Sequence, residues 1–251
     1  MIINTRNLLL LGLLLAGSTT IHAQSLVGFK GGITVPNLEG NNPASSGYKS
    51  RLDVYGGIFW QIPLENSFYI QPELVYSPQG GKRVGVQEVP GDLLSGYNLP
   101  PGTTLYADFR TVTNLNYLEL PVLGKFMFGR KIKYFVCAGP YVALLLGART
   151  RTSGTSQLYF DAMETQPLSQ NGTPLPAVDF TSRSDIRQSI KDWNFGAQGG
   201  VGLHYPLASG WLVAEGRVIV GITSIQKYPE TDGKNQTGAL VGSVGYIFNI
   251  K

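Results

Sequence analysis

Residues 192–205 read Asp-Trp-Asn-Phe-Gly-Ala-Gln-Gly-Gly-Val-Gly-Leu-His-Tyr. The odd-numbered positions carry Trp, Phe, Ala, Gly, Val, Leu and Tyr, whereas the even-numbered positions carry only small or polar residues. Successive side chains of a β-strand point to opposite faces, so this two-residue period predicts a strand with one apolar face. Aromatic residues lie near both ends of that face.

The same alternation recurs along the chain and predicts eight strands in total. The connections between them alternate between long and short, which is typical of outer-membrane barrels with tight periplasmic turns and long outer loops. The expected strands are Leu26–Thr34, Leu52–Ile62, Phe68–Ser77, Asn116–Phe128, Lys133–Arg149, Asp192–Tyr205, Trp211–Ile222 and Ala239–Ile250. The long connections are 35–50, 79–113, 150–190 and 223–237, and the short ones are 63–67, 129–133 and 206–210.

A lipid bilayer explains this pattern, because backbone groups in hydrocarbon must be paired within the protein and strands can therefore span only as a closed sheet. We predict an all-β fold, an eight-stranded antiparallel transmembrane β-barrel with its apolar faces toward lipid. Aromatic residues should form girdles at the two interfaces. One girdle comprises Trp60, Phe68, Phe128, Tyr134, Tyr205 and Phe248, and the other comprises Tyr76, Trp193 and Phe195. Pro140, which cannot donate to a ladder, predicts a bulge or local break in its strand.

The rival structure is a secreted, soluble β-sandwich, which would also alternate. Its outward face should be richly charged, yet charged residues are only 14% of the chain. Glycine is abundant (32 residues), which argues against a helical bundle. Aromatic residues make up 11% of the chain, which argues against disorder.

The N-terminus has the layout of a secretory signal. Arg6 precedes the short apolar run 8–16, and small or polar residues lead to Ala23. We predict that residues 1–23 form a cleaved signal peptide and that residues 24–251 form the barrel domain; the alternative is a membrane anchor, for which the run is short. Without Arg6, 19 basic residues face 16 acidic ones, a balance too even for a nucleic-acid binder.

The polar faces of the expected strands would line a narrow interior. An eight-stranded barrel is wide enough only for side chains or one small ligand, and buried charges are tolerated when they are paired. We therefore expect a structural polar network in the lumen, with a conducting or ligand-gated lumen as the alternative. Its members are Lys30, Arg51, Lys125 and Arg217 against Asp53, Glu73, Glu119, Asp192 and Glu215, together with His204.

Signatures of catalysis or cofactor binding are weak. His204 is the one His after residue 23, and Cys137 is the single Cys of the chain. Gly80-Gly81-Lys82 lacks the remaining residues of a P-loop, and no EF-hand loop occurs in the sequence. We expect no catalytic, cofactor or metal site.

The long connections 79–112 and 150–190 are too apolar for purely solvated tails. Two interpretations remain open for them: they fold back over the barrel mouth, or they form a docking surface for an outer protein partner.

Several segments resemble the PorT-like outer-membrane β-barrel family of the Bacteroidota. These are Asn116–Phe126 (NYLELPVLGKF), Ala138–Leu146 (AGPYVALLL), Gly28–Gly32 (GFKGG), Asp192–Gly196 (DWNFG) and Gly200–Gly202 (GVG). The resemblance covers the mature chain and implies an outer-membrane barrel. The family brings no catalytic residues, and its namesake takes part in type IX secretion.

The expected function is that of a non-enzymatic outer-membrane barrel that is surrounded by lipid and acts through its extracellular loops. The alternatives are an assembly or secretion factor of a type IX-like system and a small pore or ligand-transport barrel.

Overall fold

The computed structural model describes residues 25–41, 47–89, 91–94, 97, 99–100 and 102–248. The expected signal peptide, residues 1–23, lies outside these residues. In the described part of the chain, no helix combines the length and the apolar character that a membrane span requires.

Eight antiparallel strands form a closed ring in the order β5–β11–β12–β13–β1–β2–β3–β4, and pairing of β4 with β5 closes it. The strands are β1 (Leu26–Gly40), β2 (Asp53–Glu65), β3 (Phe68–Glu88), β4 (Tyr106–Phe128), β5 (Lys133–Ser153), β11 (Trp193–Leu207), β12 (Gly210–Gly221) and β13 (Asn235–Phe248). The predicted fold class is confirmed. We call the two ends of the barrel the short-turn end, where β2–β3, β4–β5 and β11–β12 are joined, and the long-loop end.

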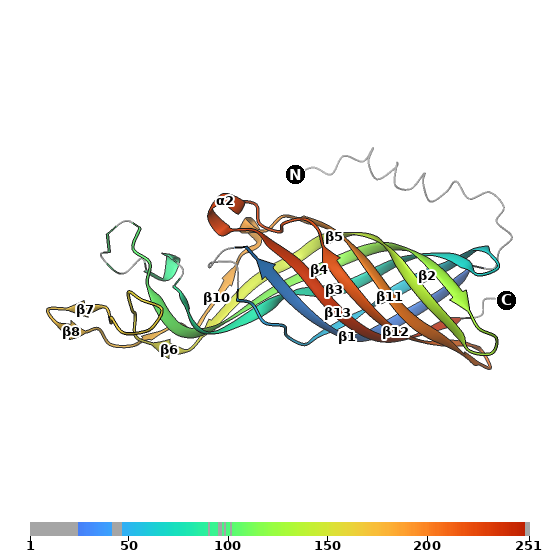
Figure 1. The fold of residues 1–251 in the computed structure, drawn as a ribbon, viewed down its shortest axis with the longest axis horizontal. Coiled ribbons are helices and arrows are strands. Elements are labelled where there is room, and N and C mark those ends of the chain that lie inside the picture. Colours follow the sequence, from blue (N-terminus) through green and yellow to red (C-terminus); the bar gives the residue numbers. More distant parts are fainter. Residues whose placement is uncertain are drawn as a thin grey trace.

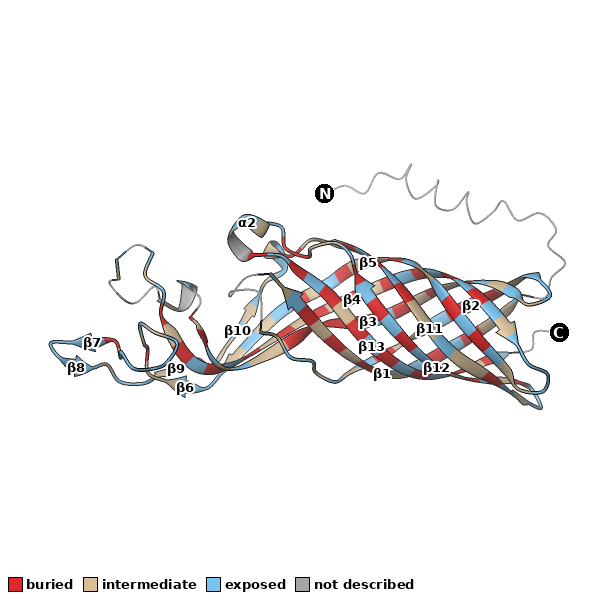
Figure 2. Cartoon of the chain, viewed as in Figure 1, coloured by how far each residue is buried: buried red, intermediate tan, exposed pale blue. Residues whose placement is uncertain are grey.

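The alternation of the sequence matches the two faces of the wall. On β4, Leu120, Val122 and Phe126 are exposed on the outside, whereas Leu123 and Lys125 are almost completely buried. Bands of buried and exposed residues alternate along the barrel strands (Figure 2). The apolar residues therefore face outward and the charges inward, which is the reverse of a soluble sandwich.

The aromatic residues predicted for the two girdles are all exposed. At the short-turn end, Phe68 packs against Phe126 with ring centroids 4.9 Å apart, and Phe128 packs against Tyr134 at 5.9 Å. Tyr76, Trp193 and Phe195 lie toward the other end of the apolar belt.

Of the bulge or local break expected at Pro140, the structure shows the local break. Pro140 pairs with Ala197 of β11, and the β4–β5 pairing is interrupted between Pro121 and Gly124 but resumes in the same register. The wall thus accommodates the missing N–H by a local gap. The register of β4 and β5 shifts instead where Asn116 and Tyr117 face Gly147 and Leu145, which leaves Leu146 as the extra residue.

Three strands continue well beyond the ring at the long-loop end. β3, β4 and β5 have 21, 23 and 21 residues, whereas the other barrel strands have 12 to 15. The expectation of long loops at 79–113 and 150–190 is therefore wrong in part, since 79–88, 106–113 and 150–153 are strand. These strands, with the segments attached to them, form a projection that points away from the barrel rather than folding back over its mouth (Figure 1).

Short elements complete this projection, which we call the outer extension (residues 80–113 and 149–185). They are the 3₁₀ helix η1 (Gly91–Leu94) and the strands β6 (Thr155–Ser156), β7 (Ser169–Gln170), β8 (Thr173–Pro174), β9 (Val178–Asp179) and β10 (Ser182–Asp185). β10 pairs with the end of β5. At the same end of the barrel, η2 (Arg187–Ser189) and α2 (Pro229–Asp232) lie in the connections before β11 and before β13.

Candidate functional site: the lumen and the outer extension

The lumen is layered along the barrel axis. The inward residues of β12 show the order from the short-turn end: Val213, Glu215, Arg217 and Ile219. Val213 belongs to a buried apolar cluster with Phe59, Leu123, Phe135, Cys137 and Ile247. Ile219 belongs to a larger one with Leu38, Tyr55, Val75, Leu115, Tyr117, Tyr141, Ala143, Leu145, Ala148, Ile190, Ile225, Ala239 and Val241. A belt of charged side chains therefore lies between two apolar layers.

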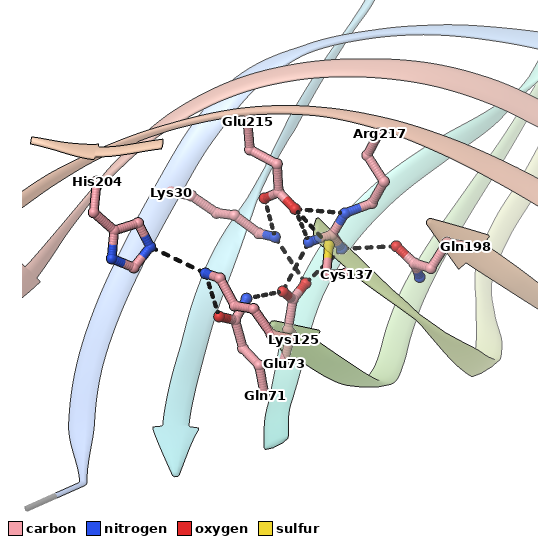
Figure 3. Close-up of polar contacts among 9 residues, drawn as sticks. All are labelled: Lys30, Gln71, Glu73, Lys125, Cys137, Gln198, His204, Glu215 and Arg217. Atoms are coloured by element: carbon pink, nitrogen blue, oxygen red, sulfur yellow. Dashed lines mark hydrogen bonds and ion pairs between the residues drawn. The ribbon is translucent and has the colours of Figure 1, made fainter. Parts of the chain in front are cut away.

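Four ions from three parts of the sequence meet at the centre of this belt (Figure 3). The guanidinium of Arg217 donates to both carboxylate oxygens of Glu73, at 2.8 and 2.9 Å, and its Nε donates to Glu215 at 3.0 Å. The ammonium of Lys30 lies 2.8 Å from Glu73 and 3.3 Å from Glu215. Each side chain is at most 3% exposed, so the ion pairs are sealed from water.

A second cation extends the belt toward the short-turn end. Lys125 donates to Gln71 Oε1 at 3.0 Å, and Gln71 Nε2 donates to Glu73 at 2.7 Å. Lys125 Nζ also lies 3.0 Å from His204 Nε2 and 3.6 Å from the centre of the Phe135 ring. Because an ammonium has no acceptor, His204 accepts at Nε2 and carries its proton on Nδ1.

The remaining carboxylate of the interior, Glu119, lies outside this chain of contacts. Its Oε1 accepts a hydrogen bond from Gln79 Nε2 at 3.3 Å. Three cations (Lys30, Lys125, Arg217) thus share the interior with three acidic residues (Glu73, Glu119, Glu215). Burying charge is tolerated only where partners replace water, and the central ions meet that condition.

The structure places the other expected members at different sites. Arg51 and Asp53 pair at 2.6 Å near the long-loop end, where their side chains are 13% and 27% exposed. Asp192 does not lie in the interior: its side chain is 48% exposed, and it lies 4.0 Å from Arg187. Asp192 immediately precedes β11, so the inward and outward alternation of that strand does not determine where the Asp192 side chain points.

Neutral polar residues missed from the sequence complete the belt. Gln198 accepts from Arg217 at 2.7 Å, and Gln71 connects Glu73 to Lys125. Both lie on the inward face of their strands, together with charged residues. The two-residue period of the sequence could therefore have identified them as members of the belt.

The interior chemistry does not resemble that of a metal centre. Within the described residues, no group of three or more His, Cys, Asp and Glu side chains is placed to hold a metal ion. Cys137 is buried, and its thiol lies 3.5 Å from Glu215.

The outer extension has a hydrophobic core of its own. Phe109 of β4 stacks on Phe180 with ring centroids 4.8 Å apart. The buried members of this core are Val89, Leu105, Ala107, Phe109, Leu158, Leu168 and Phe180. These contacts explain why segments expected as loops continue as strands.

A closed ring of strands with an apolar exterior and ions sealed inside defines a transmembrane β-barrel. Residues 22–227 match the model of the outer membrane protein beta-barrel domain, and the chain belongs to this family. The protein is located in the cell outer membrane. Its short-turn end faces the periplasm, and its long-loop end carries the outer extension outside the cell.

Solved structures of other outer-membrane proteins are similar to this chain. Ail of Yersinia pestis is 10% identical, with 90% of this chain and 99% of that chain covered and a TM-score of 0.37. Neisserial surface protein A is 13% identical, with 89% and 97% covered and a TM-score of 0.40. The N-terminal barrel domain of Pseudomonas aeruginosa OprF is 12% identical, with 90% and 98% covered and a TM-score of 0.31. The comparison with curated proteins found no match.

Proposed function

We propose that the protein is a non-enzymatic outer-membrane barrel that is plugged through its middle and binds a protein partner through its outer extension. The observation that carries this proposal is the division of the molecule into a filled barrel and a projecting segment with its own core. A filled barrel acts as an anchor, and the projection is the part that a partner outside the cell can reach.

The filled lumen argues against transport. Lys30, Glu73, Glu215 and Arg217 form ion pairs with one another, and each side chain is at most 3% exposed. The apolar layers on both sides of them contain large, fully buried side chains such as Phe59, Phe135 and Leu115. An ion crossing this lumen would have to displace both layers and break the central pairs.

One turn of the outer extension, residues 160–166, presents apolar side chains in an ordered arrangement. Met163 is 86% exposed and Phe160 is 46% exposed. Asp161 holds this turn by accepting from the backbone N–H groups of Thr165 and Gln166, at 3.1 and 2.8 Å. Exposed apolar residues held in a fixed arrangement are a common feature of protein-binding sites.

A photo-crosslinking residue at Met163 should capture one defined protein in intact cells, and F160S should reduce the yield at least about tenfold, as expected for a central contact. Adducts are measured by immunoblotting and mass spectrometry. The same probe at Lys131, in a periplasmic turn, serves as the control. Absence of an adduct at Met163, or an adduct that F160S leaves unchanged, would contradict partner binding at this turn.

The narrower assignment to the PorT-like family of the Bacteroidota remains a proposal, supported by the resemblance of Asn116–Phe126 and the other quoted segments. A role as an assembly or secretion factor of a type IX-like system is the second candidate function. A secretion component captured at Met163 would favour it.

A further inference from the structure

Four arginines gather on one face of the outer extension, next to the membrane-spanning wall. Arg110 lies on β4, Arg149 and Arg151 on β5, and Arg183 on β10, and all four are exposed. Arg151 pairs directly with Arg183 across the strands, and Arg110 lies opposite Ser153, two residues from Arg151. Directly paired residues of a sheet share a face, so these side chains form one group, which we call the arginine face.

The bulge at Leu146 sets the direction of two of these side chains. Before the bulge, the outward residues of β5 have even numbers and include Leu144 and Leu146. After it, Ala148 is buried while Arg149 and Arg151 are exposed. Without the extra residue, the arginines would point to the opposite face of the sheet, because a shift of one residue reverses every side chain.

The arginine face lies just above the headgroup layer of the membrane. Residues 134–144 of β5 supply the roughly 9–11 tilted residues that cross the hydrocarbon. A strand tilted by 45° climbs about 2.3 Å per residue, so the Cα atom of Arg149, five residues after Leu144, lies about 12 Å above the end of this crossing. The headgroup layer is itself about 5–7 Å thick on each side, and long arginine side chains can reach into it.

A hollow of about 430 Å³ lies directly below the arginine face. Its lining includes Tyr76, Asn116, Leu146, Arg149, Asp185 and Arg187. Arg187 is held in place by donating to the carbonyl oxygens of Leu146 and Leu145, at 2.8 and 3.1 Å. The hollow therefore combines an apolar side toward the membrane with guanidinium groups toward the outside.

The arginine face has more positive charge than its neighbours neutralise. Asp185 lies directly opposite Arg149 across the strands, and Asp108 lies two residues before Arg110, so two carboxylates share this face with four arginines. None of the four arginines forms an ion pair within the described residues. Asp185 accepts the backbone N–H of Arg187 at 2.9 Å. Like charges directly opposite each other destabilise a sheet. An anion bound between Arg151 and Arg183 would therefore stabilise this part of the sheet.

We propose that the arginine face and the hollow bind the phosphate-bearing headgroup of an outer-leaflet lipid. Guanidinium groups bind phosphate through paired hydrogen bonds. Leu146 and Tyr76 would contact the upper part of the acyl chains. This site is independent of the partner-binding turn, residues 160–166, and of the plugged lumen.

Native mass spectrometry of the refolded full chain, titrated with purified lipid A and with dephosphorylated lipid A, tests this site. We expect lipid A to bind the wild type, and R149Q/R151Q to weaken binding about 25-fold, since each basic residue near a charged bilayer surface contributes roughly a factor of five. The control R130Q/K131Q removes two charges from a periplasmic turn and should bind like the wild type. Heat-dependent migration on gels verifies that each variant is folded.

Three results would overturn the proposal. They are equal binding of dephosphorylated lipid A, unchanged binding by folded R149Q/R151Q, and displacement of lipid A by millimolar inorganic phosphate, which would mean a free-anion site. Loss of binding in the control as well would indicate a general charge effect and would also count against it.

Discussion

Replacing Arg217 with Met is expected to lower the free energy of unfolding by about 3–5 kcal/mol, because it breaks a buried ion network by removing one partner. Arg217, like Lys30, contacts both Glu73 and Glu215, and its side chain is 1% exposed. Without it, two buried carboxylates share the single ammonium of Lys30. Urea unfolding of protein refolded in lipid vesicles measures the change.

Two further variants show whether the loss comes from unpaired charge. R130M removes an exposed arginine from a periplasmic turn and should change stability by no more than about 0.5 kcal/mol. E73Q/R217M removes one charge of each sign and should be more stable than R217M alone, because fewer buried carboxylates lack a partner. If R217M had the same free energy of unfolding as the wild type, the central ion pairs would contribute nothing to the stability of the barrel.

Replacing Val122 with Arg should destabilise the inserted barrel by about 2–4 kcal/mol, the cost of a cation at the bilayer midplane. Val122 lies in the middle of the apolar belt of β4 and is 49% exposed on the outside of the wall. Exposure here means contact with lipid rather than with water. The measurement is again reversible unfolding in vesicles.

Val86 provides the matched control for this variant. It is 37% exposed, but it lies on the part of β3 that belongs to the outer extension, directly opposite Asp108. V86R should change stability by no more than about 0.5 kcal/mol, since the new charge stays in water and faces a carboxylate. Equal effects of V122R and V86R would show that the belt does not face hydrocarbon.

The barrel itself was predictable because a membrane enforces a strict two-residue period on each wall-forming segment. Residues 192–205 and Asn116–Phe128 show this period without interruption, and the structure has β11 and β4 there. The same period indicates which side chains point inward. It does not indicate which of them meet: Arg217 and Glu73 are 144 positions apart, and their contact depends on the curvature of the closed ring.

The outer extension was not predictable from local pattern. Residues 79–113 were expected as a long connection, yet β3 continues to Glu88, with Gly80 and Gly85 at positive φ angles of 125° and 109°. The contacts that make this segment a strand come from residues far along the chain, such as Phe180 against Phe109. The position of the bulge likewise depends on how β4 and β5 meet, which no single strand reveals.

Single-channel recording of the refolded full chain in a planar bilayer tests the sealed lumen most directly. Two apolar layers around a paired charged belt predict no steady conductance above that of the bare bilayer, for wild type and for the control R130M alike. A steady, ohmic conductance from folded wild-type protein would contradict the plug and favour a pore.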